Sequence, residues 1–270
     1  MHPGERSALM EKIKPGFLAE LHARKAFKEA GFNLSTHYYV DAEGFKSREI
    51  DILAVRKVDT RYSQFVHIVV GEVKHGYTWI CGDDSPPDRT EPSAVEVGRP
   101  EWFKKLRVAS SSEAFSLATD FLPGLDLMAP LFATSMHPIG QDSLYEAVTT
   151  LVKAVASLEP PLPDNRHFWV AVPLLILDGN LLGVEYGSDG QMTLGPRDHV
   201  QYGFTFASPG YPKVERYIHI VTLDALPGFL RRILEAEDKA SELANQLYLE
   251  LHRRPAEESS PPIETIPASP

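Results

Sequence analysis

Hydrophobic and polar positions alternate over short stretches in the first part of the chain, and this alternation predicts strands rather than helices. The stretches cover residues 33–40, 48–55 and 64–74. Ahead of them, Pro15 and Gly31 stand in the order that favours the start and the end of a helix. Within that helix, one broad side carries the apolar residues Phe17, Ala19, Ala23, Ala26, Phe27 and Ala30. The pattern predicts one helix followed by three strands.

The middle of the chain predicts a long insertion and then a second helix. Residues 81–100 are rich in Pro, Asp and Gly, and they open an insertion that we place at about residues 81–140. Inside it, residues 100–121 predict a helical stretch and residues 131–135 a short strand. Residues 142–158 predict a clearer amphipathic helix, whose apolar side carries Leu144, Val148, Leu151, Val152 and Val155.

The C-terminal part predicts a buried strand, a hairpin, a further strand and a long helix. Residues 167–177 have the continuous apolar character of a strand that is buried on both faces. The DGN sequence at 178–180 predicts a hairpin turn into a strand at 181–186. A strand at 217–223 and a helix at 226–253 follow.

Composition predicts one domain with a tail. The chain has 270 residues, of which 43% are hydrophobic, and this is enough for one well-buried domain, which we place at residues 1–254. Residues 255–270 are rich in Pro, Glu and Ser and predict a disordered tail. The longest apolar runs fall far short of the roughly 20 residues that span a bilayer, so we expect no membrane partner. A single cysteine, Cys81, excludes an intrachain disulfide and fits a cytoplasmic protein. The net charge of −10 counts against a strong, free-standing DNA binder.

Charged residues stand at unusual places in the predicted helix and strands. Glu72 and Lys74 share a strand face with the apolar residues before them, so both charges lie at the end of a buried face. Asp51 lies in mid-strand between apolar neighbours, where aspartate is disfavoured without a partner or a metal. Glu20 falls on the apolar side of the first helix. The simpler interpretations are a strand that runs into solvent and a glutamate that reaches round to water.

Together these segments resemble the PD-(D/E)xK nuclease superfamily. The resemblance rests on FLAELHARKAFKEAGF for the helix, SREIDILAV for the aspartate strand and VHIVVGEVKHG for the E-x-K strand. It implies an α/β protein with a restriction-endonuclease-like αβββαβ core, a mixed central sheet flanked by helices. To this core the chain adds the insertion after the third strand and a C-terminal hairpin, strand and helix. One departure is that Ile50 stands where the motif has proline.

The resemblance also implies a catalytic site of Glu20, Asp51, Glu72 and Lys74. Asp51 and Glu72 would bind Mg²⁺ or Mn²⁺, with the Val73 carbonyl as a further ligand and Glu20 acting through a bound water or a second ion. This fits the chemistry, because a divalent cation relieves the repulsion between carboxylates and activates water. Lys74 would orient the attacking water or stabilise charge on the phosphate.

The implied function is hydrolysis of phosphodiester bonds in nucleic acid, with DNA favoured, in defence, restriction or repair. The alternative is a nuclease-like protein that has lost activity and works as a binding or scaffold module, which the acidic composition would suit. A homodimer, or a partner protein that supplies the DNA contact, stays open.

Overall fold

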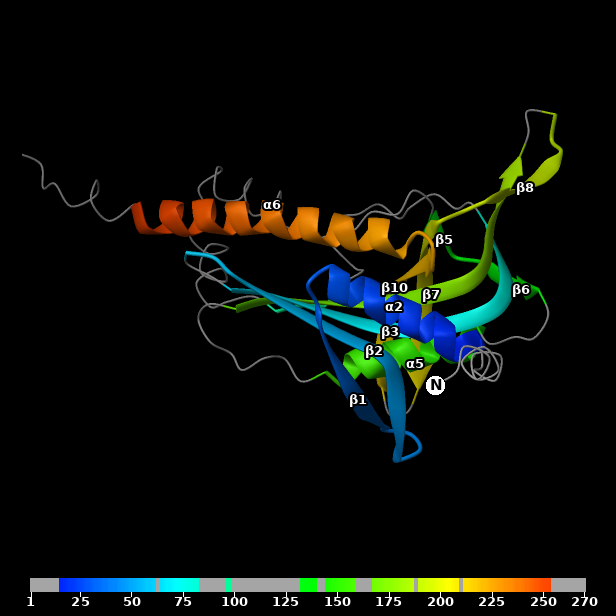
Figure 1. The fold of residues 1–270 in the computed structure, drawn as a ribbon, viewed down its shortest axis with the longest axis horizontal. Helices are drawn as coiled ribbons and strands as arrows, with labels where there is room; N and C mark the ends of the chain where they lie inside the picture. Colours follow the sequence, from blue (N-terminus) through cyan, green and yellow to red (C-terminus); the bar gives the residue numbers. More distant parts are fainter. Residues whose placement is uncertain are drawn as a thin grey trace, which may run out of the picture.

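The protein is an α/β protein in a computed structural model, and its described residues form one mixed ten-stranded sheet (Figure 1). The structure describes residues 15–61, 64–82, 96–98, 132–139, 144–158, 167–186, 189–208 and 211–253. The strands are β1 (Asn33–Asp41), β2 (Lys46–Asp59), β3 (Gln64–Cys81), β4 (Glu96–Gly98), β5 (Phe132–Ala133), β6 (Met136–Ile139), β7 (His167–Tyr186), β8 (Met192–Pro196), β9 (His199–Ser208) and β10 (Tyr211–Thr222). The helices are α2 (Pro15–Glu29), α5 (Leu144–Ala156) and α6 (Leu226–Arg253).

The sheet combines antiparallel and parallel pairs. Its main order is β1-β2-β3-β7-β10-β9-β5, with β4 and β8 paired to β7, and β6 paired to β3. The strands β1, β2 and β3 form an antiparallel meander, whereas β7 runs parallel to β3. A parallel neighbour requires a crossover connection, and α5 lies in that connection.

Helices cover both faces of the sheet and define two cores. The first core packs α2 and α6 against one face, through side chains such as Phe27, Phe65 and Phe229. The second core packs α5 against the other face, through side chains such as Val66 and Leu151. The protein therefore has three layers, with α2 and α6 on one side of the sheet and α5 on the other (Figure 1).

The first helix begins and ends close to the predicted positions, but its buried side is narrower. Gly31 has a φ of 82°, in the left-handed region that suits the residue after a helix. Ala19, Ala23 and Phe27 are buried, whereas Phe17 is 51% exposed. Ala19, Ala23 and Phe27 are spaced four residues apart, so they form one buried stripe along the helix. Phe17 precedes Ala19 by two residues, and this rotation of about half a turn directs it away from the stripe.

Several other predictions are confirmed. The helix predicted at 142–158 is α5, and its predicted apolar side chains are buried. The short strand predicted at 131–135 is β5, and the bounds of α6 are those predicted. The region predicted as an insertion contributes β4, β5 and β6 to the sheet. The helical stretch predicted at 100–121 and the tail 255–270 lie outside the described residues.

The predicted hairpin at DGN is wrong. β7 continues through Asp178–Asn180 to Tyr186 and stays paired with β3 on both sides of an irregularity at His75–Thr78. A Cβ atom on Gly179 would lie 2.1 Å from the Tyr77 carbonyl oxygen, so two strands approach closely there. The glycine thus serves this close approach instead of a turn. The antiparallel partner of the end of β7 is β8, so the chain reverses after Tyr186. Neither β8 nor β9 was predicted.

None of the described helices is both long and apolar enough to cross a membrane.

Candidate functional site

Asp51 lies at a β-bulge in β2. Ser35 pairs with Leu53 and His37 with Ile50, so Asp51 and Ile52 together stand opposite the single residue Thr36. Such an extra residue interrupts the alternation of side chains and re-aims those beside it. Ile50 accordingly packs in the second core, whereas Ile52 packs in the first. Ile50 and Ile52 therefore lie on opposite faces of β2, although plain alternation would place both on one face.

The strands β2 and β3 separate at the same place. The last pair of residues in their ladder is Ile52 and Gly71, which are the chain neighbours of Asp51 on β2 and Glu72 on β3. A Cβ atom on Gly71 would lie 3.1 Å from the Ile52 Cβ, so glycine permits the close approach of the last pair. Continuing the register would set Asp51 opposite Glu72. We call this point, where the two strands part, the fork.

Side chains replace the missing ladder bonds at the fork. The Val73 N–H donates to Asp51 Oδ2 over 2.8 Å. The Arg24 guanidinium of α2 donates to the Asp51 carbonyl oxygen, also over 2.8 Å. Backbone groups away from water need such partners, so Asp51 is held by both its side chain and its main chain. The Val73 carbonyl, expected as a metal ligand, belongs to a residue of β3 that pairs with Ile176 of β7.

Glu72 and Lys74 form an ion pair beside the fork. Lys74 Nζ lies 2.9 Å from Glu72 Oε1, and the two side chains are 20% and 13% exposed, respectively. On β3 they follow Val66, Ile68 and Val70, all buried in the second core. The charges therefore emerge at the end of a buried face, as the sequence pattern predicts.

Burial raises the pKa values of both carboxyls at the fork. Burial, together with the charge of Asp51, raises the pKa of Glu72 to about 7. Burial also raises the pKa of Asp51, although the hydrogen bond from Val73 opposes this. Burial by itself would lower the pKa of Lys74, but the neighbouring carboxylates, with Glu72 first among them, together raise it.

Glu20 approaches the fork from α2. Burial and then the charge of Asp51 raise the pKa of Glu20, while Arg24 lowers it. Arg24 Nη1 lies 3.7 Å from Glu20 Oε1 and also bonds the Asp51 main chain, so it connects the helix carboxylate to the bulge. Glu20 and Asp51 are thus close enough for their charges to interact. Glu20 reaches this point from α2, which lies on the face of the sheet opposite α5.

The donor set at the fork fits a divalent cation in part. Asp51 and Glu72 supply oxygen ligands of the kind Mg²⁺ and Mn²⁺ prefer. A cation would offset the burial that raises both pKa values and the charge of Asp51 that raises the pKa of Glu72. Among the described residues, however, no three His, Cys, Asp or Glu side chains stand close enough together to hold an ion. Two carboxylates are therefore in place, and Glu20, which pairs with Arg24, would act through water.

Glu146 is a residue near the fork that the sequence analysis did not single out. It lies in the first turn of α5, and its charge raises the pKa values of both Glu72 and Lys74. The sequence does contain a sign of this residue, namely a carboxylate in the first turn of the predicted helix 142–158. That helix packs on the face of the sheet that leads to the E-x-K pair. Apolar periodicity alone does not register such a residue.

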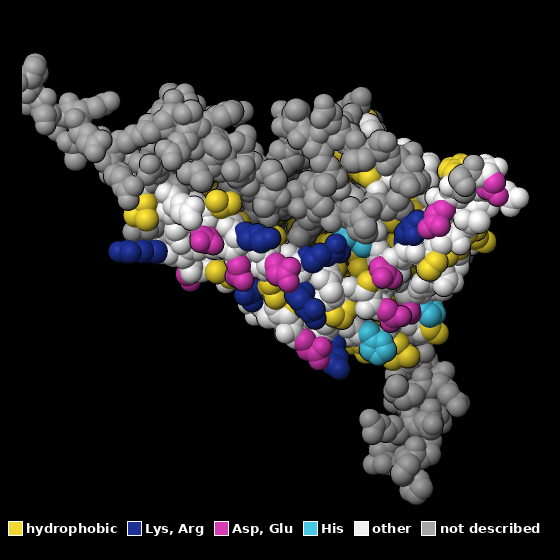
Figure 2. Space-filling model, turned by 90° about the horizontal axis from the view of Figure 1, so that it is seen from above, with side chains coloured by type: hydrophobic (Ala, Val, Ile, Leu, Met, Phe, Trp, Pro, Cys, Tyr) yellow, Lys and Arg dark blue, Asp and Glu magenta, His cyan; other side chains and the backbone are white. Residues whose placement is uncertain are grey.

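Charges of both signs are interspersed over the described part of the face in Figure 2, without a continuous basic surface. Comparison with protein-family models, with curated proteins and with solved structures finds no match to this chain.

Proposed function

We propose that the chain is a divalent-metal-dependent nuclease that hydrolyses phosphodiester bonds, with DNA as the favoured substrate. The observation that carries the proposal is the fork, where Asp51, Glu72 and Lys74 meet as two strands part. Buried carboxylates with raised pKa values are costly to maintain and are a feature of functional sites.

We further propose that the core is restriction-endonuclease-like. The order α2, β1, β2, β3, α5, β7 supports this, because it follows the αβββαβ series once the inserted strands β4, β5 and β6 are set aside. The parallel pairing of β7 with β3 is a second supporting feature.

Each residue of the fork has a definite task in this proposal. Asp51 and Glu72 would hold Mg²⁺ or Mn²⁺, which supplies a polarised phosphoryl oxygen and a more acidic water. The Val73 hydrogen bond orients the Asp51 carboxylate, and Arg24 holds its main chain. Lys74 places a positive charge beside the carboxylates, where negative charge develops on a phosphate in the transition state.

A second candidate is an inactive binding or scaffold module. The observation that favours it is the direct Lys74–Glu72 ion pair, because the lysine already compensates the buried carboxylate without a metal. The two candidates differ in one measurable property, which is metal-dependent cleavage.

The test is a cleavage assay on duplex DNA, single-stranded DNA and RNA, each with Mg²⁺, Mn²⁺ or a chelator. We expect cleavage with metal only, and a loss of about 100-fold or more in Lys74→Ala. The matched control is Lys57→Ala, since Lys57 is an exposed lysine on β2. Cleavage by Lys74→Ala at the wild-type rate would contradict the assigned site, and absence of cleavage on every substrate would favour the scaffold.

A further inference from the structure

A cavity of about 180 Å³ lies between the β1–β2 hairpin and α5, on the same face of the sheet as Glu72. Its lining includes Tyr39 of β1, Arg48 of β2, and Tyr145, Glu146, Thr149 and Lys153 of α5. Tyr39 and Arg48 are directly opposite each other in the β1–β2 ladder. The nearby end of the hairpin and one side of the helix therefore shape the cavity.

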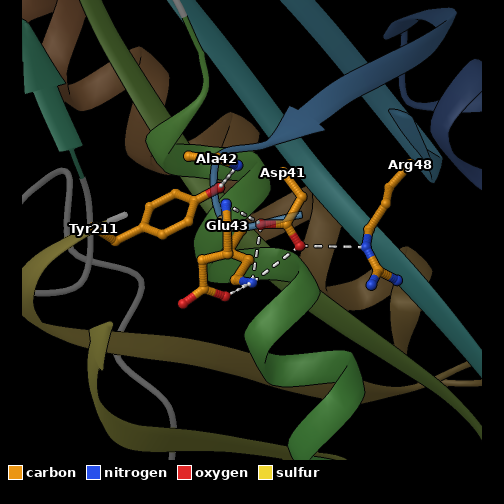
Figure 3. A network of polar contacts seen from close by, with 6 residues as sticks. Asp41, Ala42, Glu43, Arg48 and Tyr211 are labelled. Carbon is orange, nitrogen blue, oxygen red and sulfur yellow. Dashed lines mark hydrogen bonds and ion pairs between the residues drawn. The ribbon is translucent and has the colours of Figure 1, made fainter. Parts of the chain in front are cut away.

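The charges around this cavity compensate one another. Lys153 is buried and contacts Asp41 at 3.0 Å, and it also forms an ion pair with Glu43. Arg48 Nε lies 3.4 Å from the same Asp41 carboxylate. A dashed line marks this ion pair in Figure 3. The Tyr211 hydroxyl further ties the hairpin by accepting a hydrogen bond from the Ala42 N–H (Figure 3). Because both cations already have carboxylate partners, the cavity favours a neutral polar group over an anion.

Two hydroxyl groups of the lining lack hydrogen-bond partners among the described residues: Tyr39 Oη and Thr149 Oγ1. Tyr39 is only 2% exposed. Thr150 lies near Tyr39 and offsets part of the rise in its pKa that burial causes, without reaching the geometry of a hydrogen bond. A buried hydroxyl without a partner costs free energy, so these two groups select for a ligand that carries both donors and acceptors.

An aromatic surface lies at the mouth of the cavity. Tyr145 is 62% exposed, and its ring forms a T-shaped pair with that of Phe204 at 6.0 Å between centroids. A tyrosine ring that is mostly exposed offers a surface for stacking on a planar ring. The lining thus joins a stacking surface to buried hydrogen-bonding groups.

Glu146 connects the cavity electrostatically to the fork. Glu146 lines the cavity, and its charge also acts on Glu72 and Lys74. On β2, Arg48 precedes the Asp51 bulge by three residues. A strand of nucleic acid with its phosphate at Lys74 would therefore carry its next bases past this cavity.

We propose that this cavity binds one unpaired nucleobase of the strand whose phosphate lies at the fork. The volume is below the range of roughly 300–1,000 Å³ that suits larger ligands, and so it fits a single ring-sized group. The inference rests on the proposed nuclease function and deepens it, because a base can enter only from a single-stranded or locally opened substrate. The substrate class is accordingly nucleic acid with an unpaired base beside the cleaved bond.

The experiment measures binding separately from cleavage. Fluorescently labelled single-stranded oligonucleotides, matching duplexes, and a series with an abasic site at each position in turn are titrated in the presence of a chelator. We expect the single strand to bind about tenfold more tightly than the duplex, and one abasic position to cost about tenfold. Tyr39→Phe and Thr149→Val should remove most of that abasic effect. The matched controls are Tyr38→Phe and Thr193→Val, which alter exposed residues of the same types.

Stability separates a binding role of the two hydroxyls from a structural one. Removing a buried hydroxyl that has no partner should leave the melting temperature unchanged or raise it, so both variants are expected to fold. A lower melting temperature in Tyr39→Phe and Thr149→Val would show that the hydroxyls are structural, and it would overturn the proposal.

The outcomes also distinguish this inference from the proposed nuclease function. A flat abasic series, or equal binding of single strand and duplex, overturns the base-binding cavity even if the protein cleaves. Position-dependent binding without cleavage under any metal supports the cavity and contradicts the nuclease function. Position-dependent binding together with metal-dependent cleavage supports both proposals.

Discussion

Asp51 accepts a hydrogen bond from the Val73 N–H at the position where β2 and β3 separate. A side-chain oxygen here takes the place of a main-chain acceptor of the neighbouring strand. The carboxylate is therefore already oriented by its own fold, and only part of its hydrogen-bonding capacity is used. This relationship makes Asp51 suitable for replacement by its amide, which keeps an acceptor and removes the charge.

Asp51→Asn should fold and lose metal-dependent stabilisation. The Asn oxygen can still accept from Val73, whereas the cation loses an ionised ligand. An ion at about 100 times its Kd stabilises the folded protein by about 2.7 kcal/mol, so we expect Mn²⁺ to raise the melting temperature of the wild type clearly and that of the variant little. The matched control is Asp59→Asn, an exposed aspartate on β2, which should respond like the wild type. Equal shifts in wild type and Asp51→Asn would refute the metal assignment.

Glu72→Gln should stabilise the protein at high pH and have little effect at low pH. The folded-state pKa of Glu72 is raised to about 7 from the ordinary 4.5 by burial and by Asp51, so the folded protein binds this proton more tightly than the unfolded chain does. Stability from this group is accordingly full below about pH 4.5 and is lost as the pH rises through about 7. The gain from Gln should reach about 3 kcal/mol near pH 8 in urea unfolding.

The control for this pH dependence is Glu29→Gln. Glu29 is an exposed carboxylate paired with Lys25 on α2, and such surface pairs contribute little to stability. A difference between wild type and Glu72→Gln that stays constant from about pH 5 to about pH 8 would disprove the buried, repelled carboxylate.

Gly179→Ala should destabilise the protein by more than about 1 kcal/mol. The new Cβ would lie 2.1 Å from the Tyr77 carbonyl oxygen, and main-chain atoms in a paired sheet cannot easily move away. The contact between His75 Nδ1 and Asp178 Oδ2, 2.5 Å apart across the same irregularity, should be lost as well. Gly44→Ala is the matched control, since its nearest neighbour would be Lys46 Cγ at 3.9 Å. Equal melting temperatures for the two variants would contradict the close approach of β3 and β7.

Lys153→Met should destabilise the protein by about 1–3 kcal/mol, and the loss should be partly recovered in the double variant Lys153→Met/Asp41→Asn. The reason is that Asp41 is only 4% exposed and would lose its main cationic partner. Removing both charges leaves no buried carboxylate to compensate. Urea unfolding of the two single variants and the double variant measures the coupling, and strictly additive losses would show that the pair is not coupled.

The elements with long apolar periodicity could be predicted from the sequence. The predicted bounds of α6 and the predicted buried side of α5 both agree with the structure. Each of these helices carries apolar residues along one side over several turns. The position of Glu72 and Lys74 at the end of a buried face could also be predicted from alternation alone.

Features that depend on two strands at once could not be predicted in this way. The bulge at Asp51 arises from the pairing of β2 with β1, and neither strand shows it alone. The DGN segment carries the local chemistry of a turn, but pairing with β3 keeps it extended. Lys153, next to Val152 on α5, is buried only because carboxylates of the β1–β2 hairpin reach it. Long-range contacts decide each of these three cases.

The bulge in β2 also bears on which sequence changes this protein tolerates. Deleting one residue at Asp51 or Ile52 would restore a plain register with β1, with one residue of each strand between the pairs Ser35–Leu53 and His37–Ile50. Because cross-strand partners share a side, Ile50 and Arg48 would keep the sides they have now. A shortening of the chain by one residue at this place would thus abolish the fork, while the hairpin side of the neighbouring cavity would keep its pairing with β1.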